Sequence, residues 1–271
     1  MNGLSELGAA EPTPYQLAQI VARSLGVAEV TVESVEVETV EYSLETMTTG
    51  GRFWVHGTAR VGDRPEPFRI FVKIPQSVAR SPVLAMIPPQ FQEQVVATLP
   101  WQIEPNAYRS TLTASVPAPM RLPRCFGVID LDDQSAAMWL ESVDYDDSAW
   151  DVDRYGRAAR MLGSFAADRT VAAIDLTQLV ISEIQLGLRP GTELPEIRSI
   201  CLDGYREGPS DNGIEVPAAE LSRAHGIQAA IAGAITALPI ELFDEPVTPE
   251  LQDLAASRAE SAHILLDAVS F

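Results

Sequence analysis

The sequence predicts an α+β protein, in which a five-stranded antiparallel sheet forms the N-terminal half and helices form most of the rest. Two observations support this fold class. Between residues 30 and 141, segments rich in β-branched and aromatic residues are separated by short turns. From Ser148 onwards, apolar residues recur at the spacing of one helix face. A chain of 271 residues can form one large domain or two lobes.

The first predicted element is a short amphipathic helix. Thr13 and Pro14 suit its N-cap and first turn, and Gly26 suits the position after its last turn. One stripe of this helix is apolar: Leu17, Ile20, Val21 and Leu25. We assign residues 1–27 to this N-terminal segment.

Three strands are predicted next. The first covers about residues 30–42, and its alternation slips once, which indicates a bulge near Glu33 and Ser34. Residues 43–51 predict a connecting loop. Two further strands, 53–61 and 68–74, are joined by a turn at residues 62–65, which makes an antiparallel meander.

A helical insertion separates these strands from a second hairpin. Residues 89–99 and 101–112 predict helices, and residues 124–131 and 135–141 predict two more strands. The second half contains helices at about 149–168, at 217–237 and after Thr248. The helix at 149–168 has an apolar stripe of Ala158, Ala159, Leu162 and Phe165. The predicted domains are therefore a sheet lobe at 28–143 and a helical lobe at 144–271.

The composition excludes several classes of protein. With a formal net charge of −19, the chain has no cluster of Lys and Arg for nucleic acid or an anionic membrane. Cys125 and Cys201 lack metal-ligand spacing, which favours free thiols in a reducing cytoplasm. No secretory signal is evident, and the longest apolar run, about 227–238, is too short to span a bilayer. We expect a cytoplasmic protein without nucleic-acid or membrane partners.

The single lysine of the chain, Lys73, lies within a strand-like apolar run, whereas the other eighteen basic residues are arginines. An ammonium group is a compact point charge, and holding a phosphate is the commonest task for such a group at a fixed position. Biased codon usage, or a lysine that reaches solvent from an edge strand, would explain the same pattern.

Several short motifs stand in a fixed order along the chain. They are Phe71-Val72-Lys73, Pro100 to Glu104 with Tyr108-Arg109, Pro123-Arg124, Trp139-Leu140-Glu141, Trp150 with Arg154-Tyr155, and Ala158 to Gly163. In this order they resemble the N-terminal half of the aminoglycoside phosphotransferase and choline kinase-like family. The resemblance covers about residues 28–170 and, more loosely, the helices to 271. It implies a protein kinase-like fold with a nucleotide-binding N-lobe and a partial helical C-lobe.

The resemblance also implies which residues bind ATP. Lys73 would contact the phosphates, and Glu104 would hold its ammonium group in one rotamer. Pro105 directly follows Glu104, so either a helix starts just before this proline, or Glu93 is the partner of Lys73 instead. Both alternatives stay open at this point.

Further residues would surround the nucleotide. Gly50 and Gly51, in the loop predicted after the first strand, would cover the phosphates with backbone amides and adopt positive φ. Phe71 shares a strand face with Lys73 and would roof the adenine ring. The hinge between the lobes would be the segment that contains Leu140, Glu141 and Val143, and its backbone would pair with the adenine edge.

The printed sequence contains no His-Gly-Asp string of the kind that carries this family's catalytic base and magnesium ligands; Ala224-His225-Gly226 is followed by Ile227. The aspartates at 144–153 favour helix capping over metal binding, and the three histidines show no ligand pattern. ATP and magnesium are therefore implied by the resemblance alone, and we expect no catalytic or metal-binding residue in this chain.

Three interpretations remain open. The chain is a truncated or frame-disrupted kinase of a hydroxyl or amino small molecule. Alternatively, it is a non-catalytic relative that binds nucleotide or a partner, with an exposed helical face covered by self-association or by another chain. The third interpretation is an interaction module that shares the architecture and binds no nucleotide.

Overall fold

The computed structural model describes residues 3–40, 46–116, 118, 120–144, 150–166, 173–211, 213–236 and 246–267. The chain divides into two compact units, each of which is described by itself. The sheet unit comprises Met1–Val116 and Arg121–Asp146, and the helical unit comprises Pro117–Met120 and Asp147–Phe271.

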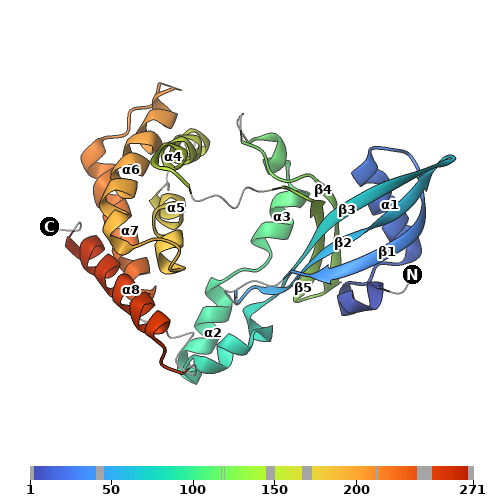
Figure 1. Ribbon diagram of the computed structural model, residues 1–271, viewed down its shortest axis with the longest axis horizontal. Helices are drawn as coiled ribbons and strands as arrows, with labels where there is room; N and C mark the ends of the chain where they lie inside the picture. Colours follow the sequence, from blue (N-terminus) through green and yellow to red (C-terminus); the bar gives the residue numbers. More distant parts are fainter. Residues whose placement is uncertain are drawn as a thin grey trace. The chain divides into compact units, whose positions relative to one another are not determined.

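The sheet unit is built on five antiparallel strands in the order β1-β2-β3-β5-β4 (Figure 1). The strands are β1 (Thr31–Thr39), β2 (Thr49–Val61), β3 (Arg64–Pro75), β4 (Cys125–Asp132) and β5 (Ser135–Glu141). The α+β class and the five-stranded antiparallel sheet are therefore confirmed. In this order β3 is the central strand, and both of its neighbours contribute backbone hydrogen bonds to it.

The register of β1 and β2 agrees with one prediction and corrects another. The pairing shifts between Val32 and Ser34, which confirms the predicted bulge. However, β2 already begins at Thr49, because β3 continues to Pro75 and supplies hydrogen-bonding partners that far. Gly50 and Gly51 are therefore strand residues and do not belong to a loop. Residues 43–45 of the predicted loop, and residues 41–42 at the predicted end of the first strand, lie outside the described residues.

The N-terminal segment covers one face of the sheet. Helix α1 (Pro14–Leu25) has a capping box, in which the Thr13 hydroxyl accepts a hydrogen bond from the Gln16 backbone amide and the Gln16 side chain accepts one from the Thr13 amide. Gly26 closes the helix in the left-handed conformation at φ 70°. Both predicted ends of this helix are confirmed. A 3-10 segment, η1 (Leu4–Ala10), precedes it.

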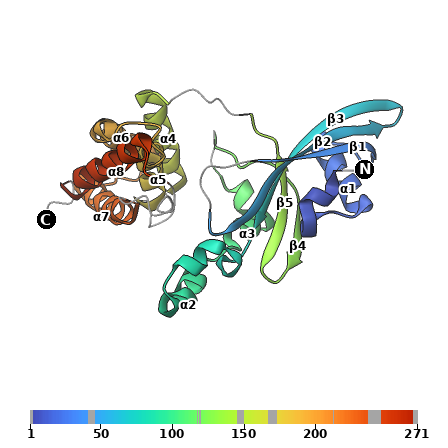
Figure 2. The same ribbon diagram turned by 60° about the horizontal axis from the view of Figure 1, so that its bottom comes forward.

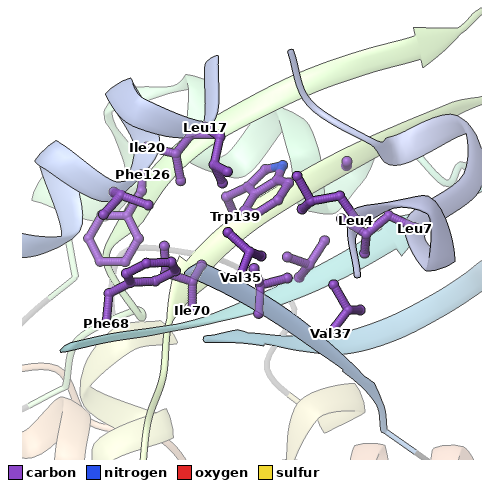
Figure 3. Close-up of a cluster of buried hydrophobic side chains, with 14 of the residues drawn as sticks. Leu4, Leu7, Leu17, Ile20, Val35, Val37, Phe68, Ile70, Phe126 and Trp139 are labelled. Atoms are coloured by element: carbon purple, nitrogen blue, oxygen red, sulfur yellow. The ribbon is translucent and has the colours of Figure 1, made fainter. Parts of the chain in front are cut away.

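Figure 3 shows how this segment joins the sheet. Side chains of η1 and α1 point toward apolar side chains of the sheet, and together with members of all five strands they form one buried core. The labelled members are Leu4, Leu7, Leu17, Ile20, Val35, Val37, Phe68, Ile70, Phe126 and Trp139. Residues 1–27 were predicted as a separate segment, but they belong to the sheet unit, because the inner face of the sheet would otherwise expose its aliphatic side chains to water.

Two helices of the insertion lie on the other side of this unit. Helix α3 (Ile103–Arg109) lies against the face of the sheet opposite to α1, and α2 (Pro89–Thr98) extends away from the sheet (Figures 1 and 2). No residue of α2 is buried. Short 3-10 segments connect these elements: η2 (Val78–Arg80), η3 (Pro82–Met86) and η4 (Thr111–Ala114). The helix predicted over 101–112 is thus shorter and ends before η4.

The helical unit contains α4 (Val152–Ala166), α5 (Ala173–Gln185), η5 (Gly191–Glu193), α6 (Leu194–Ser210), α7 (Ala218–Thr236) and α8 (Pro249–Asp267). Its core is formed mainly by aliphatic side chains of α5, α6, α7 and α8. Helices α4 and α6 approach so closely that Gly163, Gly204 and Gly208 lie against backbone atoms of the facing helix. Among the helices of the described residues, none combines the length and apolar character needed to cross a bilayer.

A polar network fixes one end of the helical unit. The Tyr155 hydroxyl of α4 donates a hydrogen bond of 2.6 Å to Glu183 Oε2 of α5. Arg189 donates from Nε to the same oxygen at 2.5 Å, from Nη1 to Glu193 Oε2 at 2.7 Å, and from Nη2 to the carbonyl of Trp150. Burial, and next the hydrogen bond to Glu183, raise the pKa of Tyr155 well above its usual value. The tyrosine therefore stays protonated and acts as a donor.

His225 of α7 should make the stability of the helical unit depend on pH. The side chain is fully buried, and both ring nitrogens lack a hydrogen-bond partner among the described residues. Burial, and next the charge of Arg198, lower its pKa to about 4. Since a histidine in an unfolded chain titrates near pH 6.5, the unfolded state binds the proton first as the pH falls. Stability should be complete above pH 6.5 and should fall by up to about 3 kcal/mol toward pH 4.

Urea unfolding followed by helical circular dichroism between pH 4 and pH 7.5 would measure this dependence. The matched variant is His225→Leu, which places an apolar side chain of similar size at the site and removes the titrating group. We expect the variant to have a flatter pH profile. A wild-type profile that is already flat would contradict the assignment.

Candidate functional site

Lys73 projects from the central strand of the sheet. Ile70 and Val72 of β3 are fully buried in the core against α1, so the alternation of the strand places Phe71 and Lys73 on the opposite face. Lys73 is paired with Arg52 of β2 and with Met138 of β5. The interpretation of Lys73 as an edge-strand lysine is therefore wrong, because strands flank it on both sides.

Glu104 of α3 is the partner of Lys73. The Lys73 Nζ donates a hydrogen bond of 2.5 Å to Glu104 Oε2, and the two side chains are 23% and 40% exposed. Helix α3 begins at Ile103, so Pro105 is its third residue, where a backbone N–H has no intrahelical acceptor to lose. This resolves the alternative left open by the sequence: Glu93 lies exposed on α2.

Tyr108 is a partly buried neighbour of the Lys73–Glu104 ion pair. Tyr108 lies one turn after Glu104 on α3, and burial, followed by the negative charge of Glu104, raises the pKa of Tyr108 to about 12. Glu104 therefore lies close to both the Tyr108 phenol and the Lys73 ammonium group, on the side of α3 that faces the sheet.

An aromatic pair lies beside Lys73 on the same face. Trp54 of β2 is directly opposite Phe71 of β3, and their ring centroids are 4.9 Å apart. The guanidinium carbon of Arg69 lies 4.0 Å from the centroid of the Trp54 ring. Phe71 is therefore where alternation predicted it, on the face of Lys73.

Sequence reasoning missed Trp54 and Arg52. Both could have been found by extending the alternation rule from β3 to β2, because residues paired across antiparallel strands point to the same side. That extension needs the register of the hairpin, and the register depends on the turn, which proved to be only two residues long, Gly62 and Asp63.

Gly50 and Gly51 lie next to the pair formed by Arg52 and Lys73, but they do not act as predicted. Among the described residues, the glycines with positive φ are Gly8, Gly26, Gly62, Gly187 and Gly213. A Cβ atom on Gly50 would lie 2.5 Å from Gln76 Oε1, and one on Gly51 would lie 2.7 Å from Phe53 Cε2. These two positions are small because side chains pack against them, and the expected positive φ is wrong.

The predicted hinge begins with the last two residues of β5, Leu140 and Glu141, and continues to Val143. Leu140 is buried and paired with Phe71, whereas the side chain of Val143 is 42% exposed. Glu141 Oε2 accepts a hydrogen bond of 3.0 Å from the backbone amide of Arg124 and one of 2.5 Å from Arg121 Nη1. The amide of Arg124, and next the Arg121 side chain, lower the pKa of Glu141. The carboxylate is thus ionised and braces the segment that leads into β4.

Other candidates from the sequence have structural roles. Asp151 Oδ1 accepts a hydrogen bond of 2.6 Å from the backbone amide of Arg154 at the start of α4, which agrees with the capping interpretation. Asp146 and Asp147 lie outside the described residues. Both cysteines are free, and Cys201 is buried while Cys125 is partly exposed. Within the described ranges, no group of three or more His, Cys, Asp or Glu side chains is placed to hold a metal ion.

No protein-family model, curated protein or solved structure matches this chain. The resemblance to the aminoglycoside phosphotransferase and choline kinase-like family therefore stays a prediction. Lys73 on the central strand β3 is held by the carboxylate of Glu104, and the aromatic pair Trp54 and Phe71 lies beside it. Such a surface can bind an anion that carries a flat ring.

Proposed function

We propose that the sheet unit is a kinase-like nucleotide-binding lobe in which Lys73 binds the phosphates of ATP. One observation carries the proposal: the 2.5 Å contact between Lys73 Nζ on β3 and Glu104 Oε2 on α3. Protein kinases hold their phosphate-binding lysine on the third strand by a glutamate of the following helix in the same way. The comparison with kinases is an analogy of architecture. The chemical argument is that a lysine held in one position by a carboxylate can bind a phosphate.

The residues around Lys73 have complementary tasks in this proposal. Glu104 orients the ammonium group, since an unpaired lysine would sample many rotamers and lose entropy on binding. Phe71 and the buried Leu140 form the apolar surface for the base. The backbone from Glu141 to Val143 is the segment proposed to pair with the edge of the base.

The resemblance to the aminoglycoside phosphotransferase and choline kinase-like family further implies phosphoryl transfer to a small hydroxyl or amino compound. ATP would supply the phosphoryl group and magnesium would neutralise its charge. The described residues offer no cluster of metal ligands, so the proposal for this polypeptide is confined to nucleotide binding. Cytoplasmic localisation is part of the same proposal.

The single lysine allows a direct test. Reductive methylation with ¹³C-formaldehyde labels only the N-terminal amine and Lys73, because the sequence has no other lysine. We expect ATP to shift the Lys73 resonance and to leave the N-terminal resonance unchanged. Calorimetric titration of the unlabelled protein should show that Lys73→Ala weakens ATP binding by about 1–3 kcal/mol, the range for a charge-assisted hydrogen bond.

Two variants serve as controls. Glu104→Gln keeps the size of the side chain but removes the charge that orients Lys73, and it should weaken ATP binding less than Lys73→Ala does. Glu93→Gln removes a carboxylate from exposed α2 and should leave the affinity unchanged. Equal ATP titrations for the wild-type protein and Lys73→Ala would overturn the proposal.

A second candidate function is a non-catalytic interaction module, and the apolar side chains of the insertion favour it. Phe91 of α2 is 51% exposed and Ile103 at the start of α3 is 66% exposed. Helix α2 has no buried residue, so the exposed ring of Phe91 is free to contact another polypeptide. Analytical ultracentrifugation of the wild-type protein and of Phe91→Gln tests whether the helix mediates self-association.

A further inference from the structure

We propose that Arg198, Ser222 and His225 bind the oxyanion group of a small ligand, a carboxylate or a phosphate, where helices α6 and α7 meet. All three residues belong to the helical unit, so this site is separate from the proposed nucleotide site of the sheet unit. Sequence spacing did not indicate it, because Arg198 comes from α6 and the other two residues come from α7.

His225 lies in the core-facing stripe of α7. The residues one turn away on either side, Leu221 and Ala229, are buried members of the apolar core, and His225 itself is fully buried. Both of its ring nitrogens lack a hydrogen-bond partner among the described residues. Buried polar atoms in native proteins nearly always have such a partner, because water is no longer there to supply one. An unpaired imidazole in an apolar stripe therefore indicates a bound polar group.

Arg198 brings a positive charge to the same place. Its Nη2 donates hydrogen bonds of 3.1 Å to the Ser222 hydroxyl and 3.3 Å to the Ser222 carbonyl. Ser222 precedes His225 by three residues on α7, so the two residues lie on the same side of the helix. The Nε of Arg198 is buried and has no hydrogen-bond partner among the described residues. Two facing helices thus bring unpaired nitrogen atoms close to each other.

The charge of Arg198 has no carboxylate partner among the described residues, because its printed contacts are both with Ser222. Burial lowers the pKa of Arg198, whereas acidic side chains raise the pKa of Arg160 and Arg189 in the same unit. A partly buried charge without a counter-charge is unfavourable. A bound anion offsets this cost, and a water molecule, which is neutral, does not.

The available donors indicate the class of the anion. Arg198 Nε, one ring nitrogen of a neutral imidazole and the Ser222 hydroxyl can each donate a hydrogen bond. A carboxylate or phosphate group has two or more oxygens, so it can accept from Arg198 and His225 at the same time. The planar guanidinium group matches the geometry of such oxyanions. The positive charge of Arg198 makes the site unsuitable for a cation.

Hydrogen exchange read out by mass spectrometry tests the site, because peptides from α6 and α7 report on it separately from Lys73, where phosphate is also expected to bind. Sodium phosphate, acetate and chloride are compared at pH 7 and equal ionic strength. The variants are Arg198→Met, Arg198→Lys and His225→Leu, with Arg223→Met as the matched control. Arg223 is exposed on α7, so Arg223→Met removes the same charge without touching the site.

At ten times the dissociation constant, phosphate or acetate should slow exchange in α6 and α7 about tenfold in the wild-type protein and in Arg223→Met. Protection by phosphate alone would identify a phosphate ligand, and protection by acetate alone would identify a carboxylate. Arg198→Met should lose this protection. His225→Leu should lose most of it, and so should Arg198→Lys, which keeps the charge but lacks the Nε donor.

Circular dichroism verifies that each variant is folded, and Arg198→Lys keeps the test valid if Arg198→Met does not fold. Equal protection in the wild-type protein and both Arg198 variants would overturn the site, as would the absence of protection by either oxyanion. Protection by chloride equal to that by phosphate and acetate would overturn the assignment to an oxyanion. Nucleotide binding at Lys73 is tested separately and does not depend on these results.

Discussion

Replacing Trp139 by alanine is expected to destabilise the sheet unit by about 3–5 kcal/mol, the range for removing a large aromatic side chain from a core. Trp139 lies on β5, is fully buried, and packs between the sheet and the N-terminal segment (Figure 3). It is paired with Val72, the neighbour of Lys73 on β3. Its loss would therefore leave a cavity directly behind the candidate site.

Hydrogen exchange read out by mass spectrometry measures this effect locally, because peptides from β3 and β5 report on the sheet unit alone. The control is Trp139→Phe, which keeps a ring in the core. The indole Nε1 has no hydrogen-bond partner among the described residues, so phenylalanine also removes a buried donor that is not satisfied. We expect a much smaller loss for this variant. Equal protection in Trp139→Ala and wild type would contradict the core described above.

The second large effect is expected in the helical unit. A Cβ atom on Gly208 of α6 would lie 2.2 Å from the carbonyl oxygen of Arg160 and 2.4 Å from the amide nitrogen of Ser164, both backbone atoms of α4. Backbone atoms cannot rotate away as a side chain can, so Gly208→Ala must push the two helices apart. We expect a loss of more than about 3 kcal/mol, although alanine is the better helix former by about 1 kcal/mol.

Gly156→Ala provides the graded control in the same helix pair. There the added Cβ would lie 2.9 Å from Ile200 Cγ2, a side-chain methyl, which can shift at a smaller cost than the backbone atoms that face Gly208. Thermal unfolding followed by circular dichroism should rank the stabilities as wild type, then Gly156→Ala, then Gly208→Ala. If Gly208→Ala unfolds at the wild-type temperature, the close packing of α4 against α6 is wrong.

The prediction was most accurate where a signal is local. The capping residues Thr13 and Gly26 predicted both ends of α1, and the slip in the alternation predicted the bulge in β1. The strand 135–141 was predicted with its observed bounds. In each case the pattern and the structure that it specifies involve residues only a few positions apart, so no knowledge of the rest of the chain was needed.

Long-range packing explains where prediction failed. The apolar stripe of α4 was predicted as Ala158, Ala159, Leu162 and Phe165. The structure buries Ala159 and packs Leu162 against the core, but it also buries Tyr155 and Gly163, which were not predicted. The side chain of Phe165 lies outside the described residues. Glycines on α6 permit a close approach there, and the contact face of α4 follows from that neighbour. Likewise, Gly50 and Gly51 became strand residues because β3 extends far enough to pair with them.

The amino-acid pattern by itself determined that Lys73 stands on a strand with Phe71 on its face, because alternation along one strand needs no partner. Only the tertiary structure decided that Glu104, and not Glu93, meets this lysine and that Arg52 lies directly opposite it. Those contacts join residues 31 and 21 positions apart in the chain. These contacts depend on where α3 begins and on the register of β2. Packing between elements sets both, so no periodic pattern in the sequence predicts them.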